Sequence, residues 1–373
     1  MNNPLLLGGI DYETFFRDYW QKRPLLVRNA LPGFDGLIDP EALFRLSSSE
    51  DVVSRLVYQK NQIWQLQHGP FKRKVFQSPQ LGATWTLLVQ ELNHHLRSAE
   101  IFLQKFDFIP HARLDDLMVS YAPPGGGVGP HFDSYDVFLI QGMGRRRWQI
   151  GAQSDLALID GLPLKILRHF IPEDEWILSP GDLLYLPPKY AHNGIAVDEC
   201  MTYSVGFRAP SAQEMATQFL VYLQDRIDLP GQYKDPDLAF QAHPGEIKEA
   251  MVEQIAAMIK RIKWEQADIA DFIGRYITEP KAHVFFRLPR RPLSMATFCK
   301  QVMSCGLRLA PQSQMVFYRE RYYLNGEPFD LPVTGILKTM ADERKISAIE
   351  MTEALIPLFY QGYLDGYFLI DKE

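Results

Sequence analysis

The sequence predicts a mainly β protein, in which a jelly-roll barrel is followed by a helical region and a winged-helix-like α+β module. Residues 116–207 contain many short strand-like segments without intervening helices, a pattern typical of barrels and of jelly rolls such as the cupins. Apolar residues recur at helical spacing after residue 211, and the last part mixes short helices with a hairpin. A chain of 373 residues exceeds one ordinary core. We therefore expect three domains, at residues 1–210, 211–280 and 281–373.

The N-terminal part is expected to add a helix and several strands to the barrel. Asp11 is a good N-cap for a helix over residues 12–22, which Pro24 ends. Residues 25–27 predict a buried strand, and residues 54–58 and 63–67 predict two paired strands. In the next segment, Thr84 or Thr86 is expected to begin a helix that continues to residue 95.

The barrel strands are predicted from short apolar runs between glycine and proline residues. They are expected at residues 117–121, 135–141, 147–150, 176–178, 182–186, 194–197 and 201–207. Ligands on different strands of a small barrel can converge on one point of its interior. This interior is therefore the expected place of a functional site.

The helical region begins at a capping box formed by Ser211 and Glu214. After a link rich in Pro, Gly and Asp, one long helical pattern covers residues 246–277. Its apolar face needs a cover, which either the last domain or a second copy of the chain could supply, so we expect a homodimer.

The last domain is expected to contain short elements only. We predict a helix at residues 295–303, a hairpin of 315–319 and 322–324 closed near Asn325 and Gly326, helices around 336–340 and 351–359, and a turn and strand over 362–370. Winged helices often bind DNA, but the charges of this module are balanced and no helix is conspicuously basic. We therefore expect a structural or partner-docking role.

The net charge, the cysteine content and the hydropathy of the chain argue against several classes of protein. The formal net charge is -6, which argues against a general nucleic-acid binder. The three cysteines, Cys200, Cys299 and Cys305, have no spacing typical of a zinc knuckle or disulfide framework. The first residues do not resemble a signal peptide, and no stretch is long enough for a membrane span. We expect a cytoplasmic protein without membrane contact.

The candidate metal site begins at His131 and Asp133, directly after a run of glycines between Pro124 and Pro130. Successive side chains of a strand point to opposite faces, so these two residues project to the same side. His192 follows another strand-like run and is the leading candidate for a third ligand. Two histidines and one carboxylate form the facial triad of non-haem iron(II) oxygenases, which leaves open positions for a co-substrate and oxygen.

The three arginines at residues 145–147 are the next candidate feature. Such a run is usually a solvated edge, yet alternation allows either Arg146, or Arg145 and Arg147, to point inward. A buried guanidinium needs an anion and matches a carboxylate well. A dicarboxylate co-substrate that chelates the iron with its keto-acid end would supply one.

Several motifs of the chain resemble JmjC-type 2-oxoglutarate oxygenases, and the bacterial ribosomal oxygenases in particular. The matching stretches are residues 20–27, 68–71, 124–131, 144–148 and 203–210, together with the spacing of His131, Asp133, Arg146 and His192. The resemblance implies a JmjC barrel, a helical dimerisation region and a C-terminal winged-helix domain. It also implies hydroxylation of an arginine side chain in a large-subunit ribosomal protein, whereas eukaryotic relatives hydroxylate a ribosomal histidine.

The resemblance also assigns roles to single residues. It implies that His131, Asp133 and His192 are the catalytic metal ligands for Fe(II), which works with O2. It implies that Arg146 binds the distal carboxylate of 2-oxoglutarate, with Ser120 and Thr202 as further co-substrate candidates. Thr202 stands where the bacterial relatives have an asparagine. A substrate arginine needs an acidic or aromatic entrance, for which the nearby candidates are Asp115, Asp116, Tyr135 and Asp136.

Three other functions remain open from the sequence. A cupin-type metal enzyme acting on a small molecule would not need Arg146. A JmjC-type hydroxylase of a histidine in another protein would share the metal site. A non-catalytic regulator would act through its C-terminal domain and bind DNA, against which the acidic balance speaks.

Overall fold

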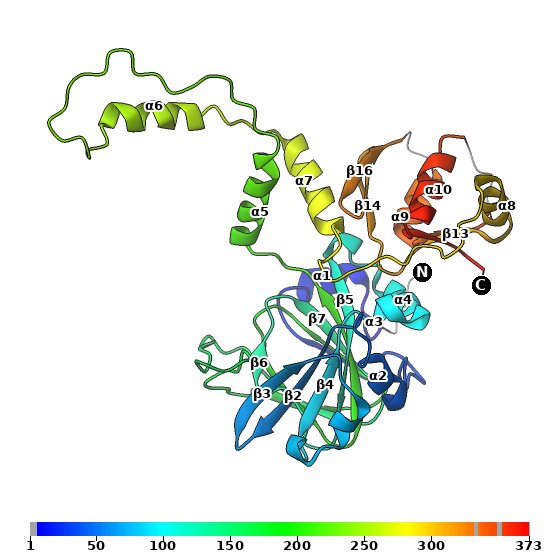
Figure 1. Ribbon diagram of the computed structural model, residues 1–373. Helices are drawn as coiled ribbons and strands as arrows, with labels where there is room; N and C mark the ends of the chain where they lie inside the picture. Colours follow the sequence, from blue (N-terminus) through cyan, green and yellow to red (C-terminus); the bar gives the residue numbers. More distant parts are fainter. Residues whose placement is uncertain (1–5, 332–334, 349–352, 373) are drawn as a thin grey trace. The chain divides into compact units, whose positions relative to one another are not determined.

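The computed structural model describes residues 6–331, 335–348 and 353–372. The chain divides into two compact units (Figure 1). The first comprises residues 1–209, 280–313 and 339–373, and the second comprises residues 210–279 and 314–338. No helix in the described parts of the chain is both long and apolar enough to cross a membrane. Our division into three domains stays a prediction.

Two antiparallel sheets build the barrel of the first unit. The larger sheet has the strand order β1-β10-β7-β12-β5-β4-β2-β3, and the smaller has the order β6-β11-β8-β9. The strands are β1 (Leu25–Val27), β2 (Ser54–Lys60), β3 (Ile63–His68), β4 (Trp85–Val89), β5 (Leu114–Ala122), β6 (His131–Phe132), β7 (Asp136–Gln141), β8 (Arg146–Gly151), β9 (Asp174–Leu178), β10 (Leu183–Leu186), β11 (Ala191–Ala196) and β12 (Cys200–Phe207). The strands predicted from the sequence all lie within these bounds or within one residue of them.

The space between the two sheets is filled by one apolar cluster. Val137 and Leu184 come from the larger sheet, and Trp148, Ile150 and Leu178 come from the smaller one. Because strand residues alternate between faces, every second residue of β7, β8 and β10 points into this interior. The predicted jelly roll is thereby confirmed.

The opposite face of the larger sheet carries the main core. Phe15, on α1 (Tyr12–Asp18), packs edge-on against Tyr185, with ring centroids 5.2 Å apart. Further short helices complete the first 120 residues: α2 (Pro40–Leu46), α3 (Leu92–His95), α4 (Arg97–Leu103) and the 3-10 turns η1 (Arg73–Gln77), η2 (Pro79–Leu81), η3 (Gln104–Phe106) and η4 (His111–Arg113).

Two N-terminal predictions were wrong in their extent or type. The helix after Asp11 ends at Asp18 rather than residue 22, because Gln21 adopts a left-handed backbone with φ of 58°. The segment expected to be helical from Thr84 or Thr86 contains strand β4, which pairs with β2 and β5. All five β4 residues are buried, so the segment lacks the alternation that identifies a strand.

The first unit also contains part of the C-terminal region. Its elements are α8 (Met295–Cys305), β13 (Leu307–Leu309), β17 (Lys345–Ile346), α10 (Ile356–Leu364) and β18 (Phe368–Ile370), with sheet order β17-β13-β18. The helix predicted over 351–359 starts later, at Ile356, and residues 349–352 lie outside the described parts. The turn predicted from residue 362 begins instead after Leu364, where α10 ends.

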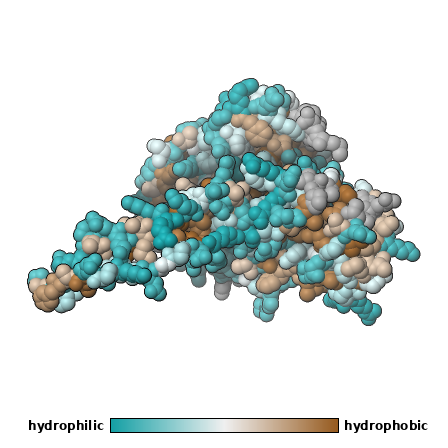
Figure 2. All heavy atoms as spheres, turned by 90° about the horizontal axis from the view of Figure 1, so that it is seen from above, coloured by the Kyte–Doolittle hydropathy of each residue, from teal (hydrophilic) through white to brown (hydrophobic). Residues whose placement is uncertain are grey.

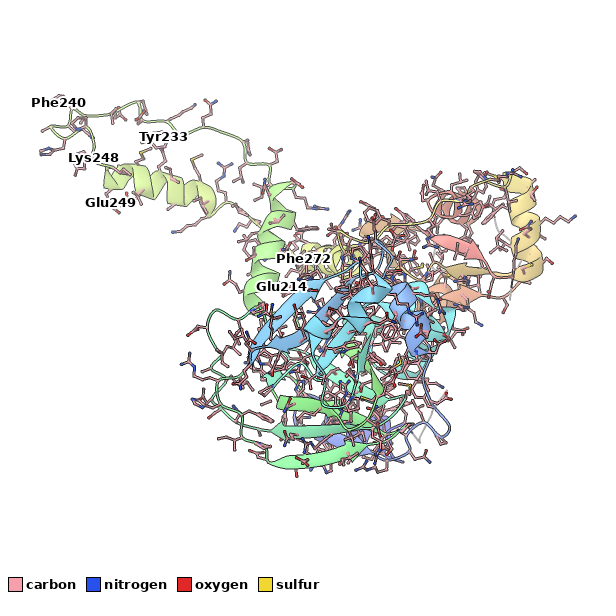
Figure 3. The ribbon with its side chains drawn as sticks, turned by 60° about the horizontal axis from the view of Figure 1, so that its bottom comes forward. Glu214, Tyr233, Phe240, Lys248, Glu249 and Phe272 are labelled. Atoms are coloured by element: carbon pink, nitrogen blue, oxygen red, sulfur yellow. The ribbon has the colours of Figure 1, made fainter. Side chains whose placement is uncertain are left out.

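The second unit contains three helices and a three-stranded sheet. Its elements are α5 (Ala212–Gln224), α6 (Glu249–Ile259), α7 (Gln266–Thr278), β14 (Met315–Tyr318), β15 (Arg321–Leu324) and β16 (Glu327–Asp330). The residues of α9 (Gly335–Glu343) divide between the two units. Ser211 caps α5 as predicted, its side chain accepting a hydrogen bond from the Glu214 N–H. On α7, Phe272 (labelled in Figure 3) has its ring centroid 5.4 Å from that of Phe219 on α5.

Two predictions for the second unit need correction. The single long helix over 246–277 is two helices, because Glu265 and Asp268 form a new capping box at the start of α7. The hairpin of β14 and β15 closes at Arg319, whose φ of 55° permits the tight turn. Asn325 and Gly326 also have positive φ, and they join β15 to β16 instead.

The aromatic core suggests a stability test at Phe138, which is fully buried and lies 4.9 Å from the Tyr185 ring and 5.1 Å from the Phe106 ring, centroid to centroid. We expect Phe138→Ala to lower the free energy of unfolding by about 3–5 kcal/mol, because it leaves a cavity that the rigid sheet cannot close. Urea denaturation measures this change. The exposed Ile171→Ala should shift it by less than about 0.5 kcal/mol. Equal effects of the two variants would contradict the assignment of the core.

Candidate metal centre and co-substrate pocket

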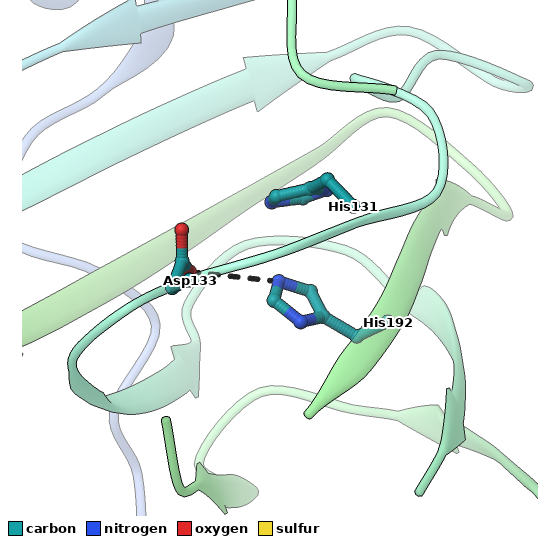
Figure 4. A group of neighbouring side chains, drawn as sticks. All are labelled: His131, Asp133 and His192. Carbon is teal, nitrogen blue, oxygen red and sulfur yellow. Dashed lines mark ion pairs between the residues drawn. The ribbon is translucent and has the colours of Figure 1, made fainter. Parts of the chain in front are cut away.

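Strand pairing brings the three predicted metal ligands together. In the smaller sheet, His192 of β11 lies directly opposite His131 of β6, and the two ring centroids are 4.2 Å apart. Asp133 follows β6, with its Oδ2 3.7 Å from Nε2 of His192 (Figure 4). One ligand atom from each residue lies within 4.8 Å of the others. The three ligand atoms can therefore bind one ion from the same side.

Hydrogen bonds orient both imidazole rings. Nδ1 of His131 lies 2.9 Å from the Gly129 carbonyl oxygen, and Nδ1 of His192 lies 2.9 Å from that of Tyr190. Because a carbonyl oxygen only accepts, each Nδ1 carries the proton and each Nε2 keeps its lone pair for a metal. Metal-binding histidines are usually held in this way.

The electrostatics of His192 favour the same protonation state. Burial of this side chain, together with the neighbouring His131, lowers the pKa of His192 to about 4. The ring is therefore neutral at pH 7, which is the form that binds a metal.

Arg146 is the arginine of the 145–147 run that points inward. It is only 4% exposed, whereas Arg147 is half-buried on the other face and Arg145 pairs outside with Asp198 at 2.8 Å. Opposite Arg146 on β11 lies Ala196, so Arg146 shares the inner face with His192. Neither Nε nor Nη2 of Arg146 has a hydrogen-bond partner among the described residues. A buried guanidinium in this state requires an anion.

Ser120 and Thr202 also face the interior, as predicted. They lie opposite each other on β5 and β12, and the Ser120 hydroxyl donates to the Thr202 carbonyl oxygen at 3.3 Å. The Thr202 hydroxyl donates to Oε1 of Gln141 at 2.9 Å. Sequence reasoning missed Gln141, although it continues the inward series of Val137 and Leu139 as a fully buried polar residue.

A cavity of about 500 Å³ reaches the metal ligands His131 and Asp133. Three of the four predicted entrance residues line it: Asp115, Asp116 and Tyr135. Met118, Ser204 and Gly206 also line it, and they were not predicted; as the next inward residues of β5 and β12, they could have been found from alternation.

Asp136, the fourth entrance candidate, was predicted wrongly. It is fully buried and accepts hydrogen bonds from the Tyr185 hydroxyl at 2.6 Å and from Nη2 of Arg113 at 3.1 Å. Tyr185 belongs to the main core, on the opposite face of the larger sheet from the metal ligands. Asp136 therefore stabilises the outer face, because its position on β7 points away from the interior.

Asp116 is a buried carboxylate in the wall of the cavity. Its Oδ2 accepts a hydrogen bond from the Glu91 main-chain N–H at 3.0 Å, and its Oδ1 faces the space beside Gly206, 3.7 Å from where a Cβ would stand. Burial, and then the charge of Asp115, raise the pKa of Asp116 to about 6. Burial and the charge of Asp133 also raise the pKa of Tyr135, so its phenol keeps its proton.

Comparison with known proteins finds two families along the chain. A model of the JmjC domain matches residues 101–215, and a model of the ROXA-like winged helix matches residues 261–365. The Escherichia coli ribosomal protein uL16 3-hydroxylase is 34% identical over 358 residues, covering 93% of this chain and 92% of the relative. A probable ribosomal oxygenase of Haemophilus influenzae is 42% identical over 231 residues, covering 61% of this chain and 54% of that protein.

Solved structures agree with the sequence comparison. An X-ray structure of E. coli ycfD superposes with a TM-score of 0.85 at 31% identity, covering 96% of this chain and 98% of that one. The structure of YcfD with cobalt and 2-oxoglutarate superposes with a TM-score of 0.81 at the same identity and coverage. Both the JmjC barrel and the winged helix expected from the sequence are confirmed. The chain belongs to the JmjC-type bacterial ribosomal oxygenases.

Proposed function

We propose that this protein is an Fe(II)- and 2-oxoglutarate-dependent oxygenase that hydroxylates an arginine side chain of a large-subunit ribosomal protein. The observation that carries the proposal is Arg146, a buried guanidinium on the same inner face as His192, whose Nε and Nη2 have no partner among the residues that the structure describes. A metal site alone is common to many cupin-type enzymes. A buried cation beside it indicates an anionic co-substrate. The relative named for uL16 makes uL16 the first substrate to test.

His131, Asp133 and His192 would hold the Fe(II), and their donor set of two imidazoles and one carboxylate fits this ion. When bound, iron with 2-oxoglutarate and O2 supplies the oxidation of a C–H bond, coupled to release of succinate and carbon dioxide. The protein's contribution is to present two imidazole Nε2 atoms and one carboxylate on one side, which leaves the other side open. Its apolar interior keeps water away from that side.

Arg146 would bind the distal carboxylate of 2-oxoglutarate. Along β11, the position opposite Arg146 is four residues from His192, a separation of about 13 Å between backbones. Both side chains point into the same interior, so a diacid co-substrate would extend from the metal ligands towards the guanidinium. Ser120 and Thr202 are the proposed supporting groups, with the Thr202 hydroxyl held by Gln141.

The cavity favours a cationic substrate side chain. Asp115 and Asp116 add negative charge at its wall, and the Tyr135 ring offers a flat surface on which a guanidinium can stack. Gly206 leaves the space between Asp116 and Tyr135 unfilled, since a Cβ there would lie 3.7 Å from each. These features support arginine over the neutral imidazole of a histidine substrate.

The second unit supports a homodimer. Four neighbouring apolar positions of α6, namely Met251, Val252, Ile255 and Ile259, are between 38% and 60% exposed. In the preceding link, Phe240 is 96% exposed (Figure 3), and Figure 2 shows apolar side chains among polar ones on this segment. An apolar helical stripe of this kind marks an association surface. We propose that a second copy covers it.

Three further assignments belong to this proposal. The domains are residues 1–210, 211–280 and 281–373, the last of which docks partners rather than DNA. Action on a ribosomal protein would place the enzyme in the cytoplasm.

The metal assignment predicts a loss of affinity in His192→Ala. We expect this variant to bind Co(II), an oxygen-stable substitute for Fe(II), more weakly by at least about 100-fold, since one of three ligands is gone. Isothermal titration calorimetry at pH 7 measures it. His169→Ala changes an exposed histidine and should bind as the unaltered protein does. Unchanged affinity in His192→Ala would remove His192 from the metal site.

The role of Arg146 predicts a selective defect in co-substrate binding. Arg146→Ala should raise the KM for 2-oxoglutarate by about 100-fold, the usual effect of removing one partner from a buried charge pair. Turnover with purified uL16, followed as succinate release, measures this value. Arg147→Ala removes the neighbouring charge from the opposite face and serves as the control. Full activity of Arg146→Ala would favour a small-molecule cupin enzyme instead.

If the exposed apolar residues of α6 form the dimer interface, a charge placed among them should separate the subunits. Ile255→Glu should convert the protein from dimer to monomer in light scattering coupled to gel filtration, because a carboxylate would be buried at an apolar interface. Glu253→Lys, at an exposed polar position of the same helix, should remain dimeric. A monomeric unaltered protein, or a dimeric Ile255→Glu, would contradict the surface assigned to the dimer.

A further inference from the structure

A lysine from a segment distant in the sequence holds the carboxylates at the cavity wall. Lys281 belongs to the first unit, although more than 150 residues separate it from the barrel strand β5. Its Nζ lies 2.9 Å from Oε1 of Glu91 and 3.0 Å from Oδ1 of Asp115. The same Asp115 oxygen is 3.2 Å from Nε of Arg208. Two cations therefore fix one cavity carboxylate, and one of them also holds Glu91.

Glu91 links this lysine to Asp116. It lies between β4 and α3 in a left-handed conformation with φ of 53°, and its side chain is buried. Besides Lys281, its carboxylate contacts Nε2 of His283 at 2.7 Å and Nδ1 of His94 at 3.5 Å. Burial alone would raise the pKa of Glu91, but these partners hold it below its usual range. The Glu91 carboxylate is thus ionised and held in place by these contacts.

The main chain of the same residue then orients Asp116. The Glu91 N–H donates to Oδ2 of Asp116 at 3.0 Å, which leaves Oδ1 turned to the space beside Gly206. A left-handed residue that is not glycine is held in place by its contacts, since its backbone conformation is unfavourable. The contacts of Lys281 and the two histidines with the Glu91 side chain therefore determine where its N–H points.

We propose that Lys281 is a positioning residue for substrate recognition: by binding Asp115 and Glu91, it holds the carboxylates that receive a cationic side chain. This inference rests on the proposed function and adds a specificity element to it. Lys281 acts through Asp115, Asp116 and Glu91, and it is assigned no contact with the metal ligands.

The charge balance explains why a cation is needed there. Glu91, Asp115 and Asp116 lie close together, and the first two each add repulsion to the charge of Asp116, whereas Lys281 offsets it. Without Lys281, repulsion among three carboxylates would displace Asp115 and favour protonation of Asp116. A neutral or displaced carboxylate binds a guanidinium poorly. The loss would fall on substrate binding rather than on the chemical step.

The test compares Lys281→Met with two matched variants. Lys281→Arg keeps the charge, and Arg290→Met removes a charge from an exposed position of the same segment. The substrate probe is purified uL16 of the same organism. We expect Lys281→Met to raise the KM for uL16 by about 10-fold with kcat changed less than about twofold, because binding and not chemistry is affected. Lys281→Arg should restore most of the affinity, and Arg290→Met should behave as the unaltered enzyme.

A second measurement needs no substrate. Carboxyl carbon NMR follows the titration of Asp116, whose charged neighbours are Asp115, Glu91 and Lys281. Removing the lysine cation should raise the pKa of Asp116 further above its ordinary range. An unchanged titration, or an unchanged KM for uL16, would overturn the inference. Absence of uL16 turnover by the unaltered enzyme would instead overturn the proposed substrate, and the titration would then test on its own whether Lys281 keeps Asp116 charged.

Discussion

The register of β11 is the constraint on which the site depends. This strand pairs with β6 on one side and β8 on the other, so it sets His192 opposite His131 and Ala196 opposite Arg146. A slip of one residue would turn His192 to the other face and separate it from both partners. The metal ligands and the buried arginine are thus positioned by the same set of backbone hydrogen bonds. Gly194 contributes to this register, because a Cβ there would lie 2.7 Å from the Trp148 ring.

The neutral His192 ring and the buried Arg146 guanidinium have opposite electrostatic requirements. His192 is buried as a neutral ring, whereas Nε and Nη2 of the Arg146 guanidinium have no hydrogen-bond partner in the described parts of the chain. In the proposed function, the carboxylate of the co-substrate would satisfy this arginine. Farther out, the carboxylates Asp115 and Asp116 suit a positive charge. The interior therefore separates an anion site from a cation site, which is what an enzyme with two different substrates requires.

The local sequence pattern was sufficient to predict which residues of one strand share a face. It was insufficient where the prediction depended on how two strands pair. His131 and Asp133 could be placed on one face from their spacing alone, and the glycines before them indicated a loop. Choosing Arg146 over Arg145 and Arg147 required the register of β8, which no local pattern contains.

Strand β4 was missed because full burial on both faces removes alternation. Asp136 was misplaced since its neighbour Tyr135 lines the cavity while Asp136 itself begins the outward series of β7. Three inward residues were also missed, although alternation identifies them once the strand faces are known: Gln141, Met118 and Ser204. Lys281 could not be found from sequence, because its partners lie far away along the chain.

An enzyme that hydroxylates one ribosomal protein adds one oxygen atom to it, and intact-mass spectrometry of ribosomal proteins detects this addition. Large subunits are purified from unaltered cells and from cells in which the gene is deleted, and every protein mass is compared. We predict that uL16 from the deletion cells is lighter by one oxygen atom and that the other masses agree. Identical masses for all ribosomal proteins in the two strains would contradict the account.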